Sequence, residues 1–355
     1  MGAAYDRFGP YTVHECLGAG GMAIVHRASI DIGGGVIREV ALKRLLPQFA
    51  DDRSFVADFV REAKIASQLR HPNIVRILEL GKHEGEYFIA MELVRGHSLQ
   101  HMQKLAAAVR LAFPVGVVIA LMAELCDALD YASSATGEDG ELLEIVHRDL
   151  TPTNLIVTHD GHLKIIDFGV AKALSGKFMT SSGLIKGKLG YMALETLAGK
   201  GVDRRADIFS LGVIAWELLT GRRLFRGVNE FETITLLQNG VQAPPSAFNK
   251  QVPAELDEIV MHALAKSRDD RWPSASVMRR PLDWMRRSYR DGAKEIAAWR
   301  RTLIPDATET VDETTATELS TRDMISDVSI SHALGADTIT DPEPTTISPE
   351  PFAED

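Results

Sequence analysis

Two short polar segments bring carboxylate and carboxamide side chains close together in the sequence. The run from His147 to Asn154 (HRDLTPTN) contains one carboxylate, Asp149, and one carboxamide, Asn154. The second segment, residues 167–169 (DFG), adds the carboxylate of Asp167. Transfer from a nucleotide to a hydroxyl requires an acceptor for the hydroxyl proton. It also requires oxygen ligands for Mg²⁺, a hard cation that takes few protein ligands plus phosphates. Asp149 suits the first task, and Asn154 and Asp167 suit the second.

Apolar runs beside these segments predict short β-strands that hold them as loops. Residues 155–157 follow the first segment, and Ile165-Ile166 precedes the second. Upstream, residues 11–46 are β-rich and contain a glycine-rich stretch from Leu17 to Val25. Its glycines allow a tight turn and clustered N–H groups that cradle phosphate, although a plain hairpin turn explains them equally well. A dinucleotide-binding unit is excluded, because a second strand follows where that unit needs a helix.

The elements after the glycine-rich stretch place further charged residues. Lys43 ends the strand VALK, and the apolar spacing predicts a helix from Arg53 to Leu69 that contains Glu62. An exposed strand lysine and a solvated helix glutamate are the plain alternatives. A strand over residues 87–94 follows, and further helices are predicted over residues 116–132, 255–266 and 275–303.

Taken together, these segments resemble the eukaryotic-type serine/threonine protein kinases, most of all their bacterial branch, over roughly residues 11–290. The matching motifs are H-R-D-L-x-x-x-N, D-F-G and G-x-G-x-x-G-x-V, with Ala23 at the third glycine. The family ending Ala-Pro-Glu is Ala-Leu-Glu here, with Leu194 in place of proline. The resemblance implies an α+β bilobal fold, with a small antiparallel β-rich lobe that has one helix, a larger mainly helical lobe, and ATP between them.

The resemblance also implies a role for each residue that matches a family motif. Asp149 would accept the proton of the substrate hydroxyl, and Lys43, held by Glu62, would position the phosphates. Asn154 and Asp167 would hold Mg²⁺, with Mn²⁺ as the alternative metal. The residues expected to bind ATP are Leu17, Gly18, Ala19, Gly20, Gly21, Met22, Ala23, Ile24, Val25, Ala41, Lys43, Met91, Glu92, Val94 and Ile156.

Residues 170–195 form the activation segment by position, and its candidate phosphosites are Thr180, Ser181 and Ser182. A phosphate there would pair with Arg148 through charge-assisted hydrogen bonds. A purely structural role for Arg148 is the alternative. Asp207 is expected to accept hydrogen bonds from the backbone of the catalytic loop. Arg271, from the sequence DDRWPS, resembles the partner of Glu195.

Two departures from the family are related. A lysine usually follows the catalytic aspartate by two residues, and a threonine follows a glycine near the end of the activation segment. Here Thr151 stands at the lysine position and Lys188 at the threonine position. We therefore expect the Lys188 ammonium to reach the γ-phosphate, with Thr151 as its neighbour. A solvated loop lysine is the alternative.

Composition and charge restrict the class of protein. Of the 355 residues 45% are hydrophobic and 25% charged, which is typical of a soluble globular protein. Two distant cysteines and an N-terminus without an apolar signal core favour the cytoplasm. The apolar run 115–129 is too short to cross a bilayer, so we predict no membrane insertion. The net charge is −10; residues 306–355 carry thirteen acidic residues and Arg322, or −12, which leaves +2 for residues 1–305. Without a basic face, no nucleic-acid partner is expected.

The predicted organisation has five parts: an N-terminal extension (1–10), the small lobe (11–94), the large lobe (95–290), a helical extension (291–304) and a disordered acidic tail (305–355). Protein substrates are the expected partners. A phosphothreonine-reading protein could also bind the tail, whose plain alternative is a solvating role.

Three other classes of activity compete with a serine/threonine kinase. A pseudokinase scaffold usually lacks a catalytic lysine or aspartate, and a small-molecule phosphotransferase would lack Arg148 and the activation-segment ending. Tyrosine or dual specificity is the subtler alternative, because Thr151 removes a lysine that marks serine/threonine kinases.

Overall fold

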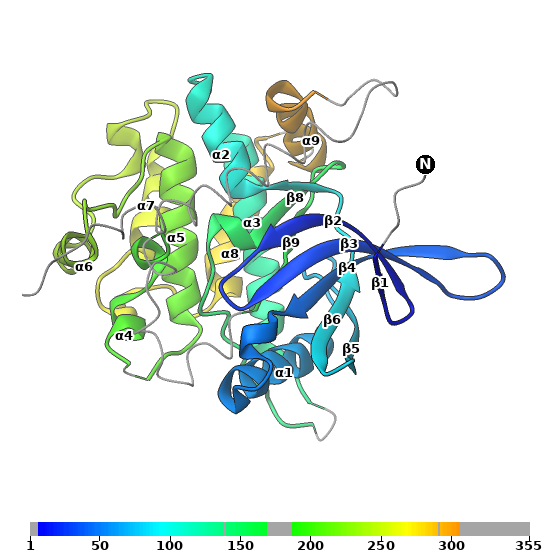
Figure 1. The fold of residues 1–355 in the computed structure, drawn as a ribbon. Helices are drawn as coiled ribbons and strands as arrows, with labels where there is room; N and C mark the ends of the chain where they lie inside the picture. Colours follow the sequence, from blue (N-terminus) through cyan, green and yellow to red (C-terminus); the bar gives the residue numbers. More distant parts are fainter. Residues whose placement is uncertain (1–5, 138–139, 169–186, 200, 290–291, 306–355) are drawn as a thin grey trace, which may run out of the picture.

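The computed structural model describes residues 6–137, 140–168, 187–199, 201–289 and 292–305. A β-rich small lobe with one helix lies beside a larger helical lobe (Figure 1). This arrangement confirms the α+β bilobal fold that the sequence predicts. The candidate phosphosites Thr180, Ser181 and Ser182 and the predicted tail after Pro305 lie outside the described residues.

The small lobe is one antiparallel sheet in the order β1-β2-β3-β4-β6-β5. Its strands are β1 (Asp6–Phe8), β2 (Tyr11–Ala19), β3 (Ala23–Asp31), β4 (Ile37–Leu45), β5 (Ile77–His83) and β6 (Glu86–Glu92). Successive side chains of a strand point to opposite faces. Val40 and Leu42 of β4 therefore join one apolar cluster, while Ala41 and Leu45 join another. Lys43 shares the face of Ala41 and Leu45.

Helix α1 (Arg53–Ser67) packs on that second face. Asp52 caps its start by accepting hydrogen bonds from the N–H groups of Ser54 and Phe55. Phe59 and Ala63 are buried in the cluster that includes Ala41 and Leu45. Glu62 is one turn from Phe59 on the same side of the helix, so its carboxylate faces the sheet and Lys43.

Strand β1 lies in the stretch that the sequence analysis assigned to an N-terminal extension. It pairs with β2 through the register Asp6↔Val13 to Phe8↔Tyr11. The ring of Phe8 is buried against Phe88, with centroids 5.5 Å apart. The sheet of the small lobe therefore begins before Tyr11.

The large lobe is built around two buried helices. Its helices are α2 (Leu99–Ala108), α3 (Val115–Ser134), α4 (Leu194–Leu197), α5 (Arg205–Thr220), α6 (Glu230–Asn239), α7 (Ala254–Ala263), α8 (Ala275–Arg286) and α9 (Gly292–Leu303). Almost every side chain of α5 is buried, and most of α3 is as well. This explains the nearly continuous apolar sequences of these helices, because a helix that is buried all round needs no polar face. No helix among the described residues is long and apolar enough to span a bilayer.

A small three-stranded sheet in the order β7-β8-β9 positions the two polar segments. Its strands are β7 (Gly96–Ser98), β8 (Leu155–Thr158) and β9 (Leu163–Ile165). Asn154 directly precedes β8, and Asp167 follows β9 by two residues. Residues before β5 join this sheet to the small lobe, because Val75 donates its N–H to the carbonyl of Ile165 at 2.9 Å.

Helix α9 closes the described part of the large lobe. Trp299 packs against Phe113, with ring centroids 3.9 Å apart and the ring planes tilted by 43°. Gly161 has a φ of +90°, and a Cβ there would lie 1.9 Å from the carbonyl oxygen of Ala293. Glycine at 161 therefore satisfies both the left-handed turn after β8 and the close approach of α9.

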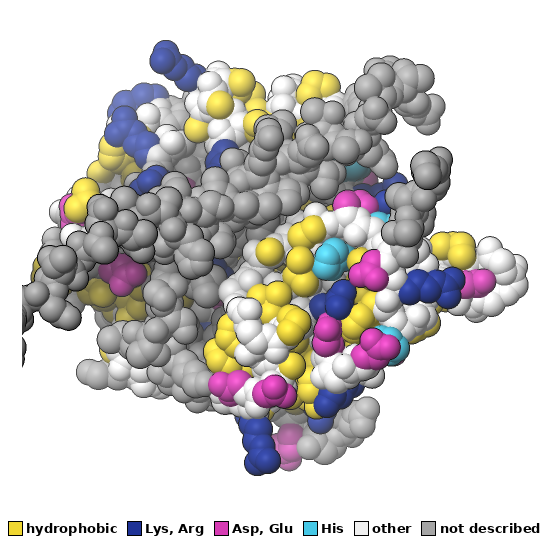
Figure 2. Space-filling view, viewed as in Figure 1, with side chains coloured by type: hydrophobic (Ala, Val, Ile, Leu, Met, Phe, Trp, Pro, Cys, Tyr) yellow, Lys and Arg dark blue, Asp and Glu magenta, His cyan; other side chains and the backbone are white. Residues whose placement is uncertain are grey.

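The surface of the small lobe mixes charges of both signs. Figure 2 shows basic and acidic side chains interspersed over the part of the sheet that faces the viewer. In this lobe, Arg27 pairs with Glu15 at 2.6 Å and with Glu39 at 2.7 Å, and Arg95 also pairs with Glu39 at 2.5 Å. Exposed pairs of this kind contribute little to stability, but they connect three strands with the segment that leaves the small lobe.

Candidate active site

Lys43 stands between two carboxylates from different elements. Its ammonium is 2.9 Å from Glu62 Oε1 on α1 and 2.7 Å from Asp167 Oδ1 beyond β9. Burial alone would lower the pKa of Lys43, but the charges of Asp167 and Glu62 outweigh it and raise that pKa above its ordinary value. Lys43 is therefore a fixed cation, and its position is set from both lobes.

A cavity of about 20 Å³ adjoins these ion pairs. The small lobe lines it with Lys43, Glu62 and Met91, and the large lobe with Ile166 and Phe168. Its volume is close to that of a single water molecule. The space behind the lysine is therefore nearly filled.

The catalytic loop that carries Asp149 is held by Asp207 of α5. The two carboxylate oxygens of Asp207 accept the N–H groups of His147 at 2.7 Å and Arg148 at 2.9 Å, as the sequence predicts. Burial raises the pKa of Asp207 to about 6, although the two backbone hydrogen bonds act in the opposite direction. The buried ring of His147 packs against Phe168, with centroids 4.7 Å apart.

Arg148 has an unusual backbone. Its φ of +63° lies in the left-handed region, which residues with a side chain rarely adopt. The N–H bond to Asp207 stabilises this conformation. The Nε atom of Arg148 is buried without a hydrogen-bond partner among the described residues.

Asn154 and Asp167 have the chemistry of a divalent-cation site. The amide nitrogen of Asn154 donates to the carbonyl of Asp149 at 2.8 Å and to its Oδ2 at 3.2 Å. With the nitrogen bound to Asp149, the amide oxygen is the atom of this side chain that could bind a cation. The Asp167 side chain is 31% exposed, and its Oδ1 accepts the ammonium of Lys43. A carboxylate and an amide oxygen are the hard ligands that Mg²⁺ prefers, so the residues present fit such an ion.

The predicted ATP-binding residues come from both lobes. Their positions are β2 for Leu17, Gly18 and Ala19, the following turn for Gly20, Gly21 and Met22, β3 for Ala23, Ile24 and Val25, β4 for Ala41 and Lys43, β6 for Met91 and Glu92, the link to β7 for Val94, and β8 for Ile156. The turn is tight, with the Gly20 N–H donating to Ala23 O at 2.8 Å. Val25, Ala41 and Met91 belong to one apolar cluster with Val94.

The connection between the lobes begins at Glu92. Its carboxylate accepts the Lys164 ammonium at 2.5 Å and the N–H of Arg76 at 3.0 Å. Its own N–H donates to the carbonyl of Arg76 at 2.9 Å. The carboxylate and the N–H group of Glu92 are therefore engaged within the protein, so the adenine contact predicted at this position would fall to its carbonyl group. The sequence analysis missed Lys164; its place opposite Ile156 in β8 becomes apparent only from the register.

Lys188 lies at the carboxylate of Asp149. Its ammonium is 2.7 Å from Oδ2 and 3.0 Å from Oδ1. The Thr151 hydroxyl is instead 2.6 Å from the hydroxyl of Thr153, a partner that the sequence analysis did not anticipate. The structure thus brings together Lys188 and Asp149, whereas the side chain of Thr151 is occupied within its own loop.

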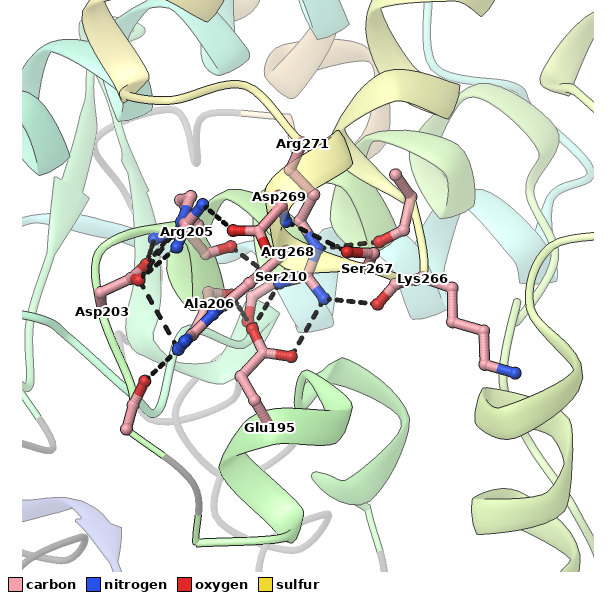
Figure 3. A network of polar contacts seen from close by, with 12 residues as sticks. Glu195, Asp203, Arg205, Ala206, Ser210, Lys266, Ser267, Arg268, Asp269 and Arg271 are labelled. Atoms are coloured by element: carbon pink, nitrogen blue, oxygen red, sulfur yellow. Dashed lines mark hydrogen bonds and ion pairs between the residues drawn. The ribbon is translucent and has the colours of Figure 1, made fainter.

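The end of the activation segment is fixed to the large lobe by an ion pair. Arg271 donates to Glu195 through NH1 at 2.5 Å and through NH2 at 3.0 Å, which confirms the predicted partners. The guanidinium also donates to three carbonyl oxygens, those of Ala265, Arg205 and Lys266. Figure 3 shows this network beside the more exposed pair of Arg205 and Asp269. All five N–H groups of Arg271 therefore have acceptors.

Comparison with known proteins agrees with this geometry. The sequence model of the protein kinase domain family matches residues 11–282 of this chain. The chain is 40% identical over 276 residues to the tyrosine-protein kinase MasK of Myxococcus xanthus, covering 78% of this chain and 43% of the relative. It is 34% identical over 273 residues to the serine/threonine-protein kinase PrkC of Bacillus subtilis, covering 76% and 39% respectively.

A solved structure gives the same result. The crystal structure of the Mycobacterium tuberculosis PknI kinase domain superposes with a TM-score of 0.58 at 30% identity, covering 80% of this chain and 99% of that chain. A two-lobed fold with a paired lysine and two loop carboxylates between the lobes is the architecture of the protein kinase class. The chain belongs to the protein kinase family. Membership of this family implies the use of ATP and a divalent metal ion. The chain spans about two fifths of the length of the curated relatives it matches.

Proposed function

We propose that this chain is an ATP-dependent protein kinase that phosphorylates serine and threonine residues of protein substrates, including its own, in bacterial signalling. The observation that carries the proposal is the simultaneous engagement of Lys43 by Glu62 and Asp167. A lysine held from both lobes is positioned for phosphates bound between them. Relatives named as serine/threonine kinases in Bacillus and Mycobacterium support the choice of acceptor.

In this proposal the protein contributes mainly orientation and charge. Bound ATP supplies the phosphoryl group, and the divalent ion neutralises its phosphates. Asp149, held by Asn154 and by the loop backbone, accepts the proton of the substrate hydroxyl. Lys43 provides a fixed positive charge, and the glycine turn provides backbone N–H groups. We assign the metal as Mg²⁺, with Mn²⁺ as the alternative, and its ligands as Asn154 and Asp167.

Tyrosine phosphorylation is the second candidate function. The relative that is 40% identical is named a tyrosine-protein kinase, and Thr151 stands where serine/threonine kinases usually have lysine. A pseudokinase scaffold has less support, because Lys43, Asp149 and Asp167 are all retained and engaged with their neighbours. The two alternatives predict different results in the same assay: phosphotyrosine for a tyrosine kinase, and no transfer for a scaffold.

Activation by phosphorylation is a further part of the proposal. The acceptors would be Thr180, Ser181 or Ser182, and the receptor would be Arg148, whose buried Nε lacks a partner among the described residues. A phosphate would supply that acceptor and lower the cost of the buried charge. Mass spectrometry of the active enzyme should find phosphate within residues 175–188. Active enzyme without any phosphate there would refute this mode of activation.

The acidic tail and the cellular location remain predictions. Phosphorylated threonines of the tail would recruit a phosphothreonine-reading protein, and the chain would act in the cytoplasm without binding nucleic acid. Deletion of residues 306–355 should leave peptide phosphorylation unchanged and reduce partner capture. Loss of basal peptide phosphorylation in the deletion variant would contradict this role for the tail.

One assay separates the candidate functions. The purified chain is incubated with labelled ATP, Mg²⁺ and a mixture of protein acceptors, and the products undergo phosphoamino-acid analysis. We expect phosphoserine and phosphothreonine. Phosphotyrosine as the main product would favour the second candidate. Label that is no higher than in a parallel Lys43→Met sample would favour a scaffold.

A further inference from the structure

The Lys188 ammonium contacts both oxygens of the proposed catalytic base. The distances from Nζ are 2.7 Å to Oδ2 and 3.0 Å to Oδ1 of Asp149. The Lys188 side chain is 30% exposed, whereas that of Asp149 is 6% exposed. The carboxylate also accepts the amide nitrogen of Asn154 at 3.2 Å. Contacts from two directions restrict rotation of the carboxylate about its last bond.

The backbone that carries Lys188 is anchored to the large lobe. A short 3-10 helix, Leu189–Tyr191, follows directly, and the N–H of Tyr191 donates to the carbonyl of Lys188 at 3.0 Å. The buried hydroxyl of Tyr191 donates to Glu217 at 2.8 Å, and its carbonyl accepts the hydroxyl of Ser210 at 2.7 Å. Both partners belong to α5. The position of the ammonium therefore depends on how residues 187–193 dock on α5.

The catalytic loop has a neutral side chain, Thr151, at the position where the family usually has a lysine. Thr151 is 3% exposed, and its hydroxyl bonds the hydroxyl of Thr153 at 2.6 Å. The cationic side chain that the structure describes at Asp149 comes instead from Lys188, which is 39 residues farther along the chain. The positive charge next to Asp149 therefore comes from a residue whose position depends on the docking of the activation-segment end.

We propose that Lys188 is the positioning residue of Asp149 and brings a second positive charge, in addition to that of Lys43, to the phosphoryl-transfer site from the end of the activation segment. This inference rests on the proposed kinase function. Two N–H groups of the ammonium hold the carboxylate, and the third remains to offset the negative charge of the group being transferred. A carboxylate and a phosphate repel each other, so a cation between them acts where the transition state gathers charge. The base is oriented only while residues 187–193 are docked.

The kinetic test compares variants at two positions. Loss of one preorganised donor lowers kcat by about 10²–10³-fold, so we expect that loss in Lys188→Met with little change in the KM for ATP. Lys188→Arg retains charge and donors and should recover most of kcat. In Lys188→Thr, adding Thr151→Lys should restore part of it. Lys250→Met, an exposed lysine far from the loop, is the matched control and should equal the wild type.

A second readout needs no nucleotide. In thermal unfolding of the ATP-free protein, we expect the melting shifts of Lys188→Met and Asp149→Asn to be non-additive in the double variant, because the pair is in direct contact. Strictly additive shifts, or an unchanged kcat in Lys188→Met, would overturn the inference. If Lys188→Met fails to fold, Lys188→Gln replaces it in both tests. A wild type without any transfer activity would instead overturn the proposed function itself.

Discussion

Replacing Glu195 with glutamine should destabilise the large lobe, because the change leaves a buried guanidinium without its counter-charge. The Arg271 side chain is 0% exposed and that of Glu195 is 13% exposed. Breaking a buried pair typically costs about 3–5 kcal/mol. The three carbonyl acceptors of Arg271 remain in Glu195→Gln, so we expect the lower end, about 3 kcal/mol. At about 2–4 °C for each kcal/mol, the melting temperature should fall by about 6–12 °C.

The assay is urea unfolding followed by tryptophan fluorescence. All four tryptophans lie in the large lobe, so the signal reports on the lobe that contains the pair. Asp269→Asn is the matched control from the same network (Figure 3), because its side chain is 78% exposed and its pair with Arg205 should contribute less than about 1 kcal/mol. The double variant Glu195→Gln/Arg271→Met should lose less than the sum of the single changes. A Glu195→Gln variant no less stable than Asp269→Asn would refute the reasoning.

Three further predictions follow from the site and its supports. Burial raises the pKa of Asp207 from 3.8 to about 6, so the folded protein binds this proton more tightly than the unfolded chain, and the contribution of Asp207 to the free energy of unfolding falls as the pH rises from about 4 to 6. Protonation also removes an acceptor from the catalytic loop, so kcat should fall below about pH 6, and Asp207→Asn should lack both effects in pH titrations of kcat and urea stability. Glu62→Gln removes a charge-assisted bond to Lys43 worth about 1.5–3 kcal/mol, so kcat/KM for ATP should fall by about 10- to 100-fold; an unchanged value would exclude the role of Glu62. Asp52→Ala removes the cap of α1 and should cost about 1 kcal/mol in urea unfolding, whereas no loss would mean that the cap is redundant.

The sequence was sufficient for contacts that motifs encode. The pairs Lys43–Glu62 and Glu195–Arg271 were predicted from the resemblance, and the backbone bonds of Asp207 were as well. Each of these residues lies in a segment whose sequence matches a family motif, and the motif indicates its position in the fold. The α3 helix was also recognisable, because an apolar run of that length fits only a buried helix in a soluble fold.

Contacts between distant segments were not predictable from spacing. The approach of Lys43 to Asp167 spans 124 residues and depends on how the lobes meet. The strand β1 has three residues, too few for a periodic pattern, and forms because Phe8 is buried by its neighbours. The bond between Thr151 and Thr153 depends on the turn of the loop, which places two hydroxyl groups together. In each case tertiary packing decides an outcome that local propensity leaves open.

The central claim is that Asp149 accepts the proton in phosphoryl transfer to protein hydroxyls. The most direct test is the kcat of Asp149→Asn for a protein acceptor, measured beside the wild type and beside Asp51→Asn, an exposed aspartate remote from the site. A positioned general base contributes about 10²–10⁴-fold. We predict a loss of that size for Asp149→Asn with ATP binding retained, and no loss for Asp51→Asn. Turnover by Asp149→Asn equal to that of the wild type would contradict the claim.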